Sequence, residues 1–129
     1  MEEGPLVRFL LDANALILLL GGHERFVDRA SDCAEGDLCL SAISFAEVLH
    51  GSASGKPPPV KVMERVRKRM AVLPFDEESA IRYAQLPFRR HRFDRLIAAH
   101  ALALNVTLVT ANPRDFEDIP DLRVVDWTR

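Results

Sequence analysis

The 129-residue sequence contains few of the residues that mark several classes of protein. It has only two cysteines, Cys33 and Cys39, which are too few for a disulfide framework or a zinc site. We expect both to be reduced thiols. The apolar run at residues 15–20 is far shorter than the roughly 20 residues that cross a bilayer, and it follows Glu2 and Glu3 rather than a basic leader. These absences favour a soluble, cytoplasmic protein with no membrane segment.

No charge of one sign dominates the chain either. It has 17 Lys and Arg and 19 Asp and Glu, which gives a net charge of -2. The chain therefore lacks the overall positive charge that is typical of nucleic-acid-binding proteins. An acidic site and a local basic patch can still cancel in that sum. The length is that of one domain, and 48% hydrophobic residues suffice to fill one core. We therefore expect a single domain over residues 1–129.

Short apolar runs alternate with helical patterns along the chain. Strands are predicted at residues 6–11, 38–41, 72–75, 107–110 and 122–125. Helices are predicted at residues 14–20, 25–35, 44–49, 60–70, 77–86 and 93–104, with a helical turn at 113–116 and a surface loop, GSASGKPPP, at 51–59. Such alternation implies right-handed crossovers and a covered parallel sheet. The expected fold class is α/β, with about five parallel strands flanked by helices on both faces.

Acidic residues fall where such a sheet would bring them together. Ligands of open parallel sheets bind beyond the carboxyl ends of the strands. Asp12 directly follows the first predicted strand, and Asp115 lies just past the fourth. Glu47 lies in the first turn of the helix after the second strand, and Asp94 at the start of the helix at 93–104. We predict that these four carboxylates are the catalytic and metal-binding residues.

The chemistry of such a cluster points to a divalent cation. Carboxylates placed together repel each other, which raises some of their pKa values unless a cation is present. Mg²⁺ prefers oxygen ligands and completes its shell with water and substrate phosphates. It generates a nucleophile from water and stabilises charge on the attacked phosphate. A phosphodiester-cleaving metal site therefore needs acids but no histidine or cysteine nucleophile.

Each acid also has a structural interpretation, which the pattern leaves open. Glu47 has the spacing of a capping box with the serine three residues before it. Asn112 and Asp115 have the spacing of a helix N-cap and its first turn. Asp94 could stabilise the positive end of its helix. Asp12 has the weakest structural interpretation, because an acid directly after an apolar strand seldom serves packing.

Four sequence blocks give a more specific indication. They are LLDANALI at 10–17, ISFAEVLHG at 43–51, FDRLIAAHALALNVTLVTANPRDF at 93–116 and DLRVVDW at 121–127. In this order they resemble the signature blocks of PIN-domain proteins, in particular the VapC-type toxins of toxin–antitoxin pairs, over nearly the whole chain. The resemblance implies an endoribonuclease, a hydrolase that depends on Mg²⁺ or Mn²⁺, whose acids are Asp12, Glu47, Asp94 and Asp115.

The resemblance also implies supporting residues and partners. Asn14, Thr110 and Asn112 match polar positions near the site. A VapC-type chain would act on RNA, form a homodimer and be silenced by a small VapB-like antitoxin. Many relatives carry an acid where this chain has Asn112, so Asp115 could bind the metal directly, act through water or contribute weakly. The segment 85–93, QLPFRRHRF, replaces a longer connection of the family.

Basic residues crowd against Asp94 in that shortened segment. Arg89, Arg90 and Arg92 are candidate RNA-phosphate contacts, or else part of a solvated loop or a partner surface. His100 lies in the alanine-rich helix, where we expect a packed or interface residue rather than a metal ligand.

Two other functions remain open from the residues. The first is a catalytically inactive PIN-like binding module whose acids persist as helix caps. The second is a phosphatase of the haloacid-dehalogenase (HAD) type, which also places an acid after its first strand. That chemistry requires a second aspartate two residues on, where this chain has Asn14. A receiver-like phosphorylation module would need a strand-end lysine, which is missing here.

Overall fold

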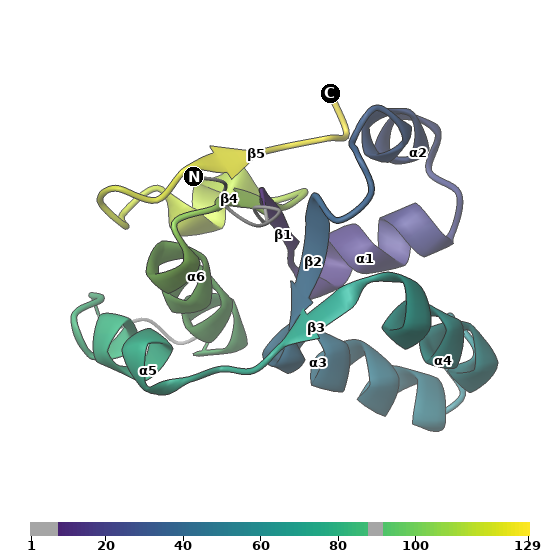
Figure 1. The fold of residues 1–129 in the computed structure, drawn as a ribbon, viewed down its shortest axis with the longest axis horizontal. Helices are drawn as coiled ribbons and strands as arrows, with labels where there is room; N and C mark the ends of the chain where they lie inside the picture. The colour runs from purple at the N-terminus through teal and green to yellow at the C-terminus, as the bar shows by residue number, and fades with distance from the viewer. Residues whose placement is uncertain (1–7, 88–91) are drawn as a thin grey trace, which may run out of the picture.

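Five parallel strands form the centre of the molecule. In the computed structural model, which describes residues 8–87 and 92–129, the strand order is β3-β2-β1-β4-β5 (Figure 1). Every neighbouring pair is parallel. The strands are β1 (Phe9–Leu11), β2 (Leu38–Ser41), β3 (Ala71–Leu73), β4 (Thr107–Val109) and β5 (Val124–Val125). The predicted α/β class and all five predicted strands are confirmed.

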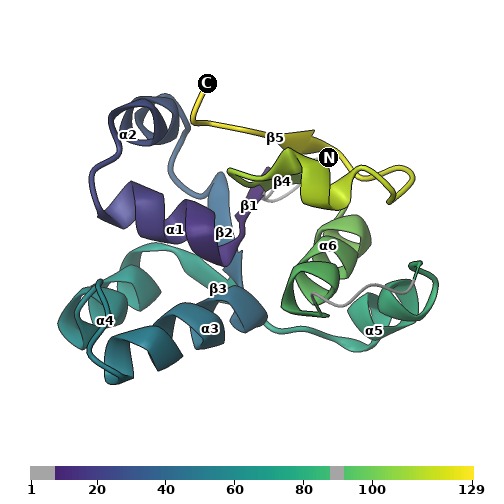
Figure 2. The ribbon, with the colours of Figure 1, turned by 180° about the vertical axis from the view of Figure 1, so that it is seen from behind.

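Helices cover both faces of this sheet. Four of them lie on one side (α1 to α4), and α5 and α6 lie on the other, as the two opposite views agree (Figures 1 and 2). The bounds are α1 (Ala13–Leu20), α2 (Glu24–Ser31), α3 (Ala42–Ala53), α4 (Val60–Arg69), α5 (Glu77–Ala84), α6 (Arg92–Leu104) and the 3-10 helix η1 (Pro113–Phe116). Within the described ranges, none of the helices is long and apolar enough to cross a membrane.

Alternate residues of β1 supply two separate cores. Leu10 lies with its register partners Cys39 and Leu108 in the core beneath α6. Leu11 and its partner Val109 lie in the opposite core, beneath α1 and α3. All five side chains are fully buried. A strand that is apolar on both faces is the signature of a central strand in a parallel sheet, which β1 is.

The start of α3 differs from the prediction. The helix begins at Ala42, three residues before the start that the capping box predicts. Its N-cap is Ser41, whose hydroxyl accepts a hydrogen bond from the N–H of Ile43 (3.0 Å). Ser44 lies inside the helix, and its hydroxyl donates to the carbonyl of Leu11 (3.2 Å). The expectation that Glu47 lies in the first turn is therefore wrong, because it lies in the second turn.

His100 is buried on α6, as predicted. Its Nδ1 lies 2.9 Å from the Ser41 hydroxyl, and its ring meets Phe75 edge to face. Burial lowers the pKa of His100, with the charge of Asp76 opposing that shift. His100 therefore helps to fix the N-terminus of α3 through its contact with the Ser41 hydroxyl.

Both cysteines are free thiols, as predicted. Cys33 is half-buried and Cys39 is fully buried. Burial raises the pKa of the Cys39 thiol to about 12. Since the thiolate is the reactive form, Cys39 is a core residue rather than a nucleophile.

Candidate active site

Asp12 lies where β1 ends and α1 begins, close to the point at which the strand order reverses. Its N–H donates to the carbonyl of Val109 at the end of β4 (3.1 Å). Its Oδ1 accepts a hydrogen bond from the N–H of Ala15 (2.8 Å), so Asp12 is also the N-cap of α1. This capping role was not predicted, although an acid three residues before a helical N–H is its usual signal. Both contacts fix the carboxylate at the carboxyl edge of the sheet.

The Asp12 carboxylate is only 4% exposed, and its environment opposes ionisation. Burial raises its pKa from 3.8 to about 6. Hydrogen bonds from Thr110 and Ala15 lower the pKa, while the negative charges of Asp94 and Asp115 raise it further. Asp12 is therefore a buried acid with like charges around it, which is costly in the absence of a cation.

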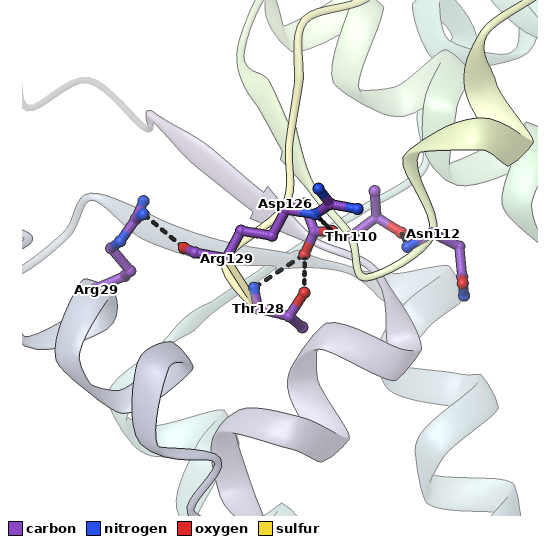
Figure 3. Close-up of polar contacts among 6 residues, drawn as sticks. All are labelled: Arg29, Thr110, Asn112, Asp126, Thr128 and Arg129. Carbon is purple, nitrogen blue, oxygen red and sulfur yellow. Dashed lines mark hydrogen bonds and ion pairs between the residues drawn. The ribbon is translucent and has the colours of Figure 1, made fainter.

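Thr110 orients Asp12 from the end of β4. It is fully buried, and its N–H donates to the carbonyl of Val125 on the neighbouring strand (3.0 Å). Its Oγ accepts a hydrogen bond from the N–H of Asn112 (3.0 Å; Figure 3), which leaves the hydroxyl proton for Asp12. Asn112 is the N-cap residue of η1 and Asp115 lies in its first turn, as their spacing predicted, but the side chain of Asn112 makes no capping hydrogen bond. Its backbone, rather than its side chain, supports the site.

Glu47 is an exposed residue in the second turn of α3, where it caps nothing. Desolvation raises its pKa, and the charges of Asp94 and Asp12 raise it further. The capping box proposed for Glu47 is thus absent, and the remaining interpretation of this acid is functional.

Asp94 and Asp115 complete the acidic group. Asp94 is half-buried in the first turn of α6, and its charge acts on both Asp12 and Glu47. Asp115 is exposed in the first turn of η1, and its charge acts on Asp12. The fold thus brings all four predicted acids into one electrostatic neighbourhood. Over residues 8–87 and 92–129, no group of three acidic, histidine or cysteine side chains lies close enough together to hold a metal ion.

The other predicted residues are distributed unevenly. Asn14 is exposed in the first turn of α1 and lines a cavity together with Glu47. Arg89 and Arg90 lie outside the described residues, and Arg92 is the first residue of α6. The predicted RNA contacts of these three arginines stay predictions.

A further acid at a strand end, Asp126, was not predicted. Its Oδ1 accepts hydrogen bonds from the N–H and the hydroxyl of Thr128, and Arg129 lies 3.6 Å from its Oδ2 (Figure 3). Burial raises its pKa, but the Thr128 hydrogen bonds and Arg129 outweigh this and hold the pKa below the usual value. The carboxylate is thus satisfied within the C-terminal segment, which Arg29 anchors by donating to the Arg129 carbonyl (2.7 Å). Its position directly after β5 was the available signal.

Comparison with known proteins decides the family. The profile described as PIN domain matches residues 9–122. The chain belongs to the PIN-domain family. Its curated relatives include the tRNA(fMet)-specific endonuclease VapC of Salmonella typhimurium, 28% identical over 95% of this chain and 99% of that protein. Ribonuclease VapC1 of Haemophilus influenzae is 29% identical over 94% of this chain and 98% of that protein.

The fold agrees with these sequence relationships. The structure of VapBC-1 from nontypeable Haemophilus influenzae has a chain of 29% identity that superposes with a TM-score of 0.78, covering 94% of this chain and 98% of that one. The PIN-domain protein described here is therefore a VapC-type endoribonuclease, and the predicted nuclease and hydrolase class are confirmed. This membership leaves no support for the HAD-type alternative.

Proposed function

We propose that this PIN-domain protein hydrolyses RNA phosphodiester bonds at a Mg²⁺ or Mn²⁺ centre held by Asp12, Glu47, Asp94 and Asp115. The observation that carries the proposal is the buried Asp12 carboxylate, whose pKa rises to about 6 among other acids. A divalent cation would remove the repulsion that these charges create. The donor set fits Mg²⁺ and Mn²⁺, because both prefer carboxylate oxygens.

The four acids have different roles in this proposal. Asp12 is the anchor, since the Val109 carbonyl, the Ala15 N–H and Thr110 all fix it. The charge of Asp94 raises the pKa of both the buried Asp12 and the exposed Glu47, which supports a place for Asp94 in the same metal centre.

In this proposal Glu47 orients the attacking water or accepts its proton, a role that its exposure and raised pKa support. Asp115 completes the group from η1, either directly or through water. When bound, the cation would supply the positive charge that stabilises the attacked phosphate.

We further propose an antitoxin partner and a homodimer for this chain. Support for the antitoxin comes from the VapBC-1 structure, to whose matched chain this protein is similar over almost its full length. The homodimer rests on the resemblance to VapC-type chains alone. Co-expression with a candidate VapB-like protein followed by co-purification tests the first proposal. Light scattering on the purified chain tests the second, and a monomer at micromolar concentration would contradict it.

Cleavage of mixed RNA by the purified protein tests the catalytic proposal. With Mg²⁺ or Mn²⁺ we expect cleavage by the wild type, and a loss of roughly 100-fold or more in Asp12→Asn and Asp94→Asn. Activity that persists in EDTA, or in those two variants, would defeat the proposed site.

Calorimetric titration with Mn²⁺ separates this enzyme from an inactive PIN-like binding module. We expect saturable binding by the wild type and much weaker binding by Asp12→Asn. Absence of binding at millimolar Mn²⁺ would favour the inactive module.

A further inference from the structure

A cavity of about 260 Å³ opens directly beside Glu47. Three segments line it: α1 contributes Asn14, α3 contributes Glu47 and Gly51, and the segment after α3 contributes Lys56. A member of the acidic group therefore shares a cavity with a cation and an amide.

The backbone of Gly51 determines where Lys56 lies. The N–H of Lys56 donates to the carbonyl of Gly51 (2.9 Å), which folds the segment after α3 back onto that helix. A Cβ at position 51 would lie 3.9 Å from both Cβ and Cδ of Lys56. The aliphatic stem of Lys56 thus lies along the bare backbone of Gly51. Because Gly51 is four residues after Glu47, this contact is on the helix face that carries Glu47.

The charge of Lys56 answers a need that the acids create. A group of four carboxylates repels an RNA backbone, whereas cleavage requires that backbone to lie against it. In the part of the chain that the structure describes, Lys56 is exposed and joins no ion pair, so its ammonium is available to a ligand. Lysine binds phosphate as a compact point charge without reading sequence.

We propose that Lys56 binds an RNA phosphate adjacent to the one being cleaved, within the cavity shared with Glu47. Asn14 lines the same cavity, where it can hydrogen-bond the same phosphate or its ribose. This inference rests on the proposed function, for which it names a substrate-binding residue. Lys56 contributes to RNA affinity and takes no part in the chemical step.

Three substitutions separate charge from packing. Lys56→Met keeps the aliphatic stem over Gly51 and removes the charge, while Lys56→Arg keeps a charge. Lys68→Met is the matched control, because it removes the same charge from an exposed position in the last turn of α4, outside the cavity.

Steady-state cleavage of a single-stranded RNA with Mn²⁺ gives the first readout. We expect Lys56→Met to raise KM roughly tenfold with kcat within about twofold, as the loss of one charge-assisted contact predicts. The slope of log affinity against log salt should become shallower by about 0.7, the value for one phosphate contact on a single strand. Lys56→Arg should stay near the wild type, and Lys68→Met should change little.

RNA binding measured by fluorescence anisotropy without divalent metal gives a second readout that does not need activity. Weaker binding by Lys56→Met alone supports the proposal. Equal binding by Lys56→Met and Lys68→Met, or a loss of kcat at unchanged KM, overturns it. A wild type that fails to cleave RNA, or that cleaves it in EDTA, would instead refute the proposed function, while the anisotropy comparison would still decide the role of Lys56.

Discussion

One guanidinium nitrogen of Arg95 hydrogen-bonds both carboxylate oxygens of Asp118. Its Nη2 lies 2.8 Å from Oδ1 and 2.9 Å from Oδ2 of Asp118. Arg95 is 4% exposed, and its Nη1 has no hydrogen-bond partner among the residues that the structure describes. Arg95 directly follows Asp94, and Asp118 lies three residues after Asp115. The ion pair therefore ties together the two segments that present these acids.

Breaking this pair from one side should destabilise the protein. We expect Asp118→Ala to lower the free energy of unfolding by ~3 kcal/mol, because it leaves a buried guanidinium without its counter-charge. Arg95→Met should cost less, since it also removes the buried Nη1. Urea denaturation measures both. The double variant should be more stable than the sum of the two single losses predicts, and strict additivity would show that the two residues act separately.

The raised pKa of Asp12 predicts how stability depends on pH. The native state binds this proton more tightly than the unfolded chain, so metal-free stability should rise as pH falls through about 6 towards 4. A shift of about two pKa units corresponds to at most ~3 kcal/mol.

Asp12→Asn removes the buried charge and keeps the capping oxygen. In EDTA near neutral pH it should therefore be more stable than the wild type by ~1–3 kcal/mol, with the gap closing at about pH 4. Thermal unfolding across this pH range measures it. A gap that does not change with pH would contradict the burial of an ionised Asp12.

The hydroxyl of Thr110 should set the acid limb of the activity profile. Thr110→Val removes the hydrogen bond that lowers the pKa of Asp12, so that pKa should rise further. The acid limb of kcat/KM with Mn²⁺ should then move to higher pH by roughly half a unit to one unit. Thr110→Ser keeps the hydroxyl and should retain the wild-type profile. Identical profiles for all three proteins would exclude the contact.

Substitutions at Glu47 and Ser41, which both belong to the N-terminal part of α3, should have opposite effects on stability and on Mn²⁺ binding. Glu47→Gln should change stability by less than about 0.5 kcal/mol, because Glu47 is exposed and caps nothing, yet it should abolish tight Mn²⁺ binding. Ser41→Ala removes the N-cap and should cost ~1 kcal/mol or more. Its Mn²⁺ binding should stay close to that of the wild type. Calorimetry and urea denaturation on both variants check this contrast.

The elements of the fold follow from local pattern, whereas their ends depend on distant contacts. The apolar run of β1 predicted a central strand, because only burial on both faces tolerates it. The predicted start of α3 was wrong because Ser41 and Ser44 are both acceptable N-cap residues by sequence. What separates them is the bond from the Ser44 hydroxyl to Leu11, which lies 33 residues away along the chain.

The candidate site divides in the same way. The strand-end rule predicted that Asp12 and Asp115 lie near each other, and the charge of Asp115 does act on Asp12. The same rule applied to β5 would also have found Asp126. Lys56 was hidden within a segment that composition predicts only as a loop, and α3 in fact continues to Ala53 inside it. Its relation to Glu47 depends on the hydrogen bond from the Lys56 N–H to the Gly51 carbonyl, which pattern alone does not reveal.

The position of β1 between β2 and β4 also determines how late the acidic group can assemble while the chain is being synthesised. The N–H of Asp12 is held by the carbonyl of Val109, almost a hundred positions later on the chain. Contacts of such separation form late, because a long loop must close before they can. During synthesis Asp12 and Glu47 leave the ribosome well before Asp94, Val109 and Asp115, and chains emerge at roughly 5–20 residues per second. With the proposed site, a ribosome that makes this protein is thereby spared its activity until Asp115 has been translated.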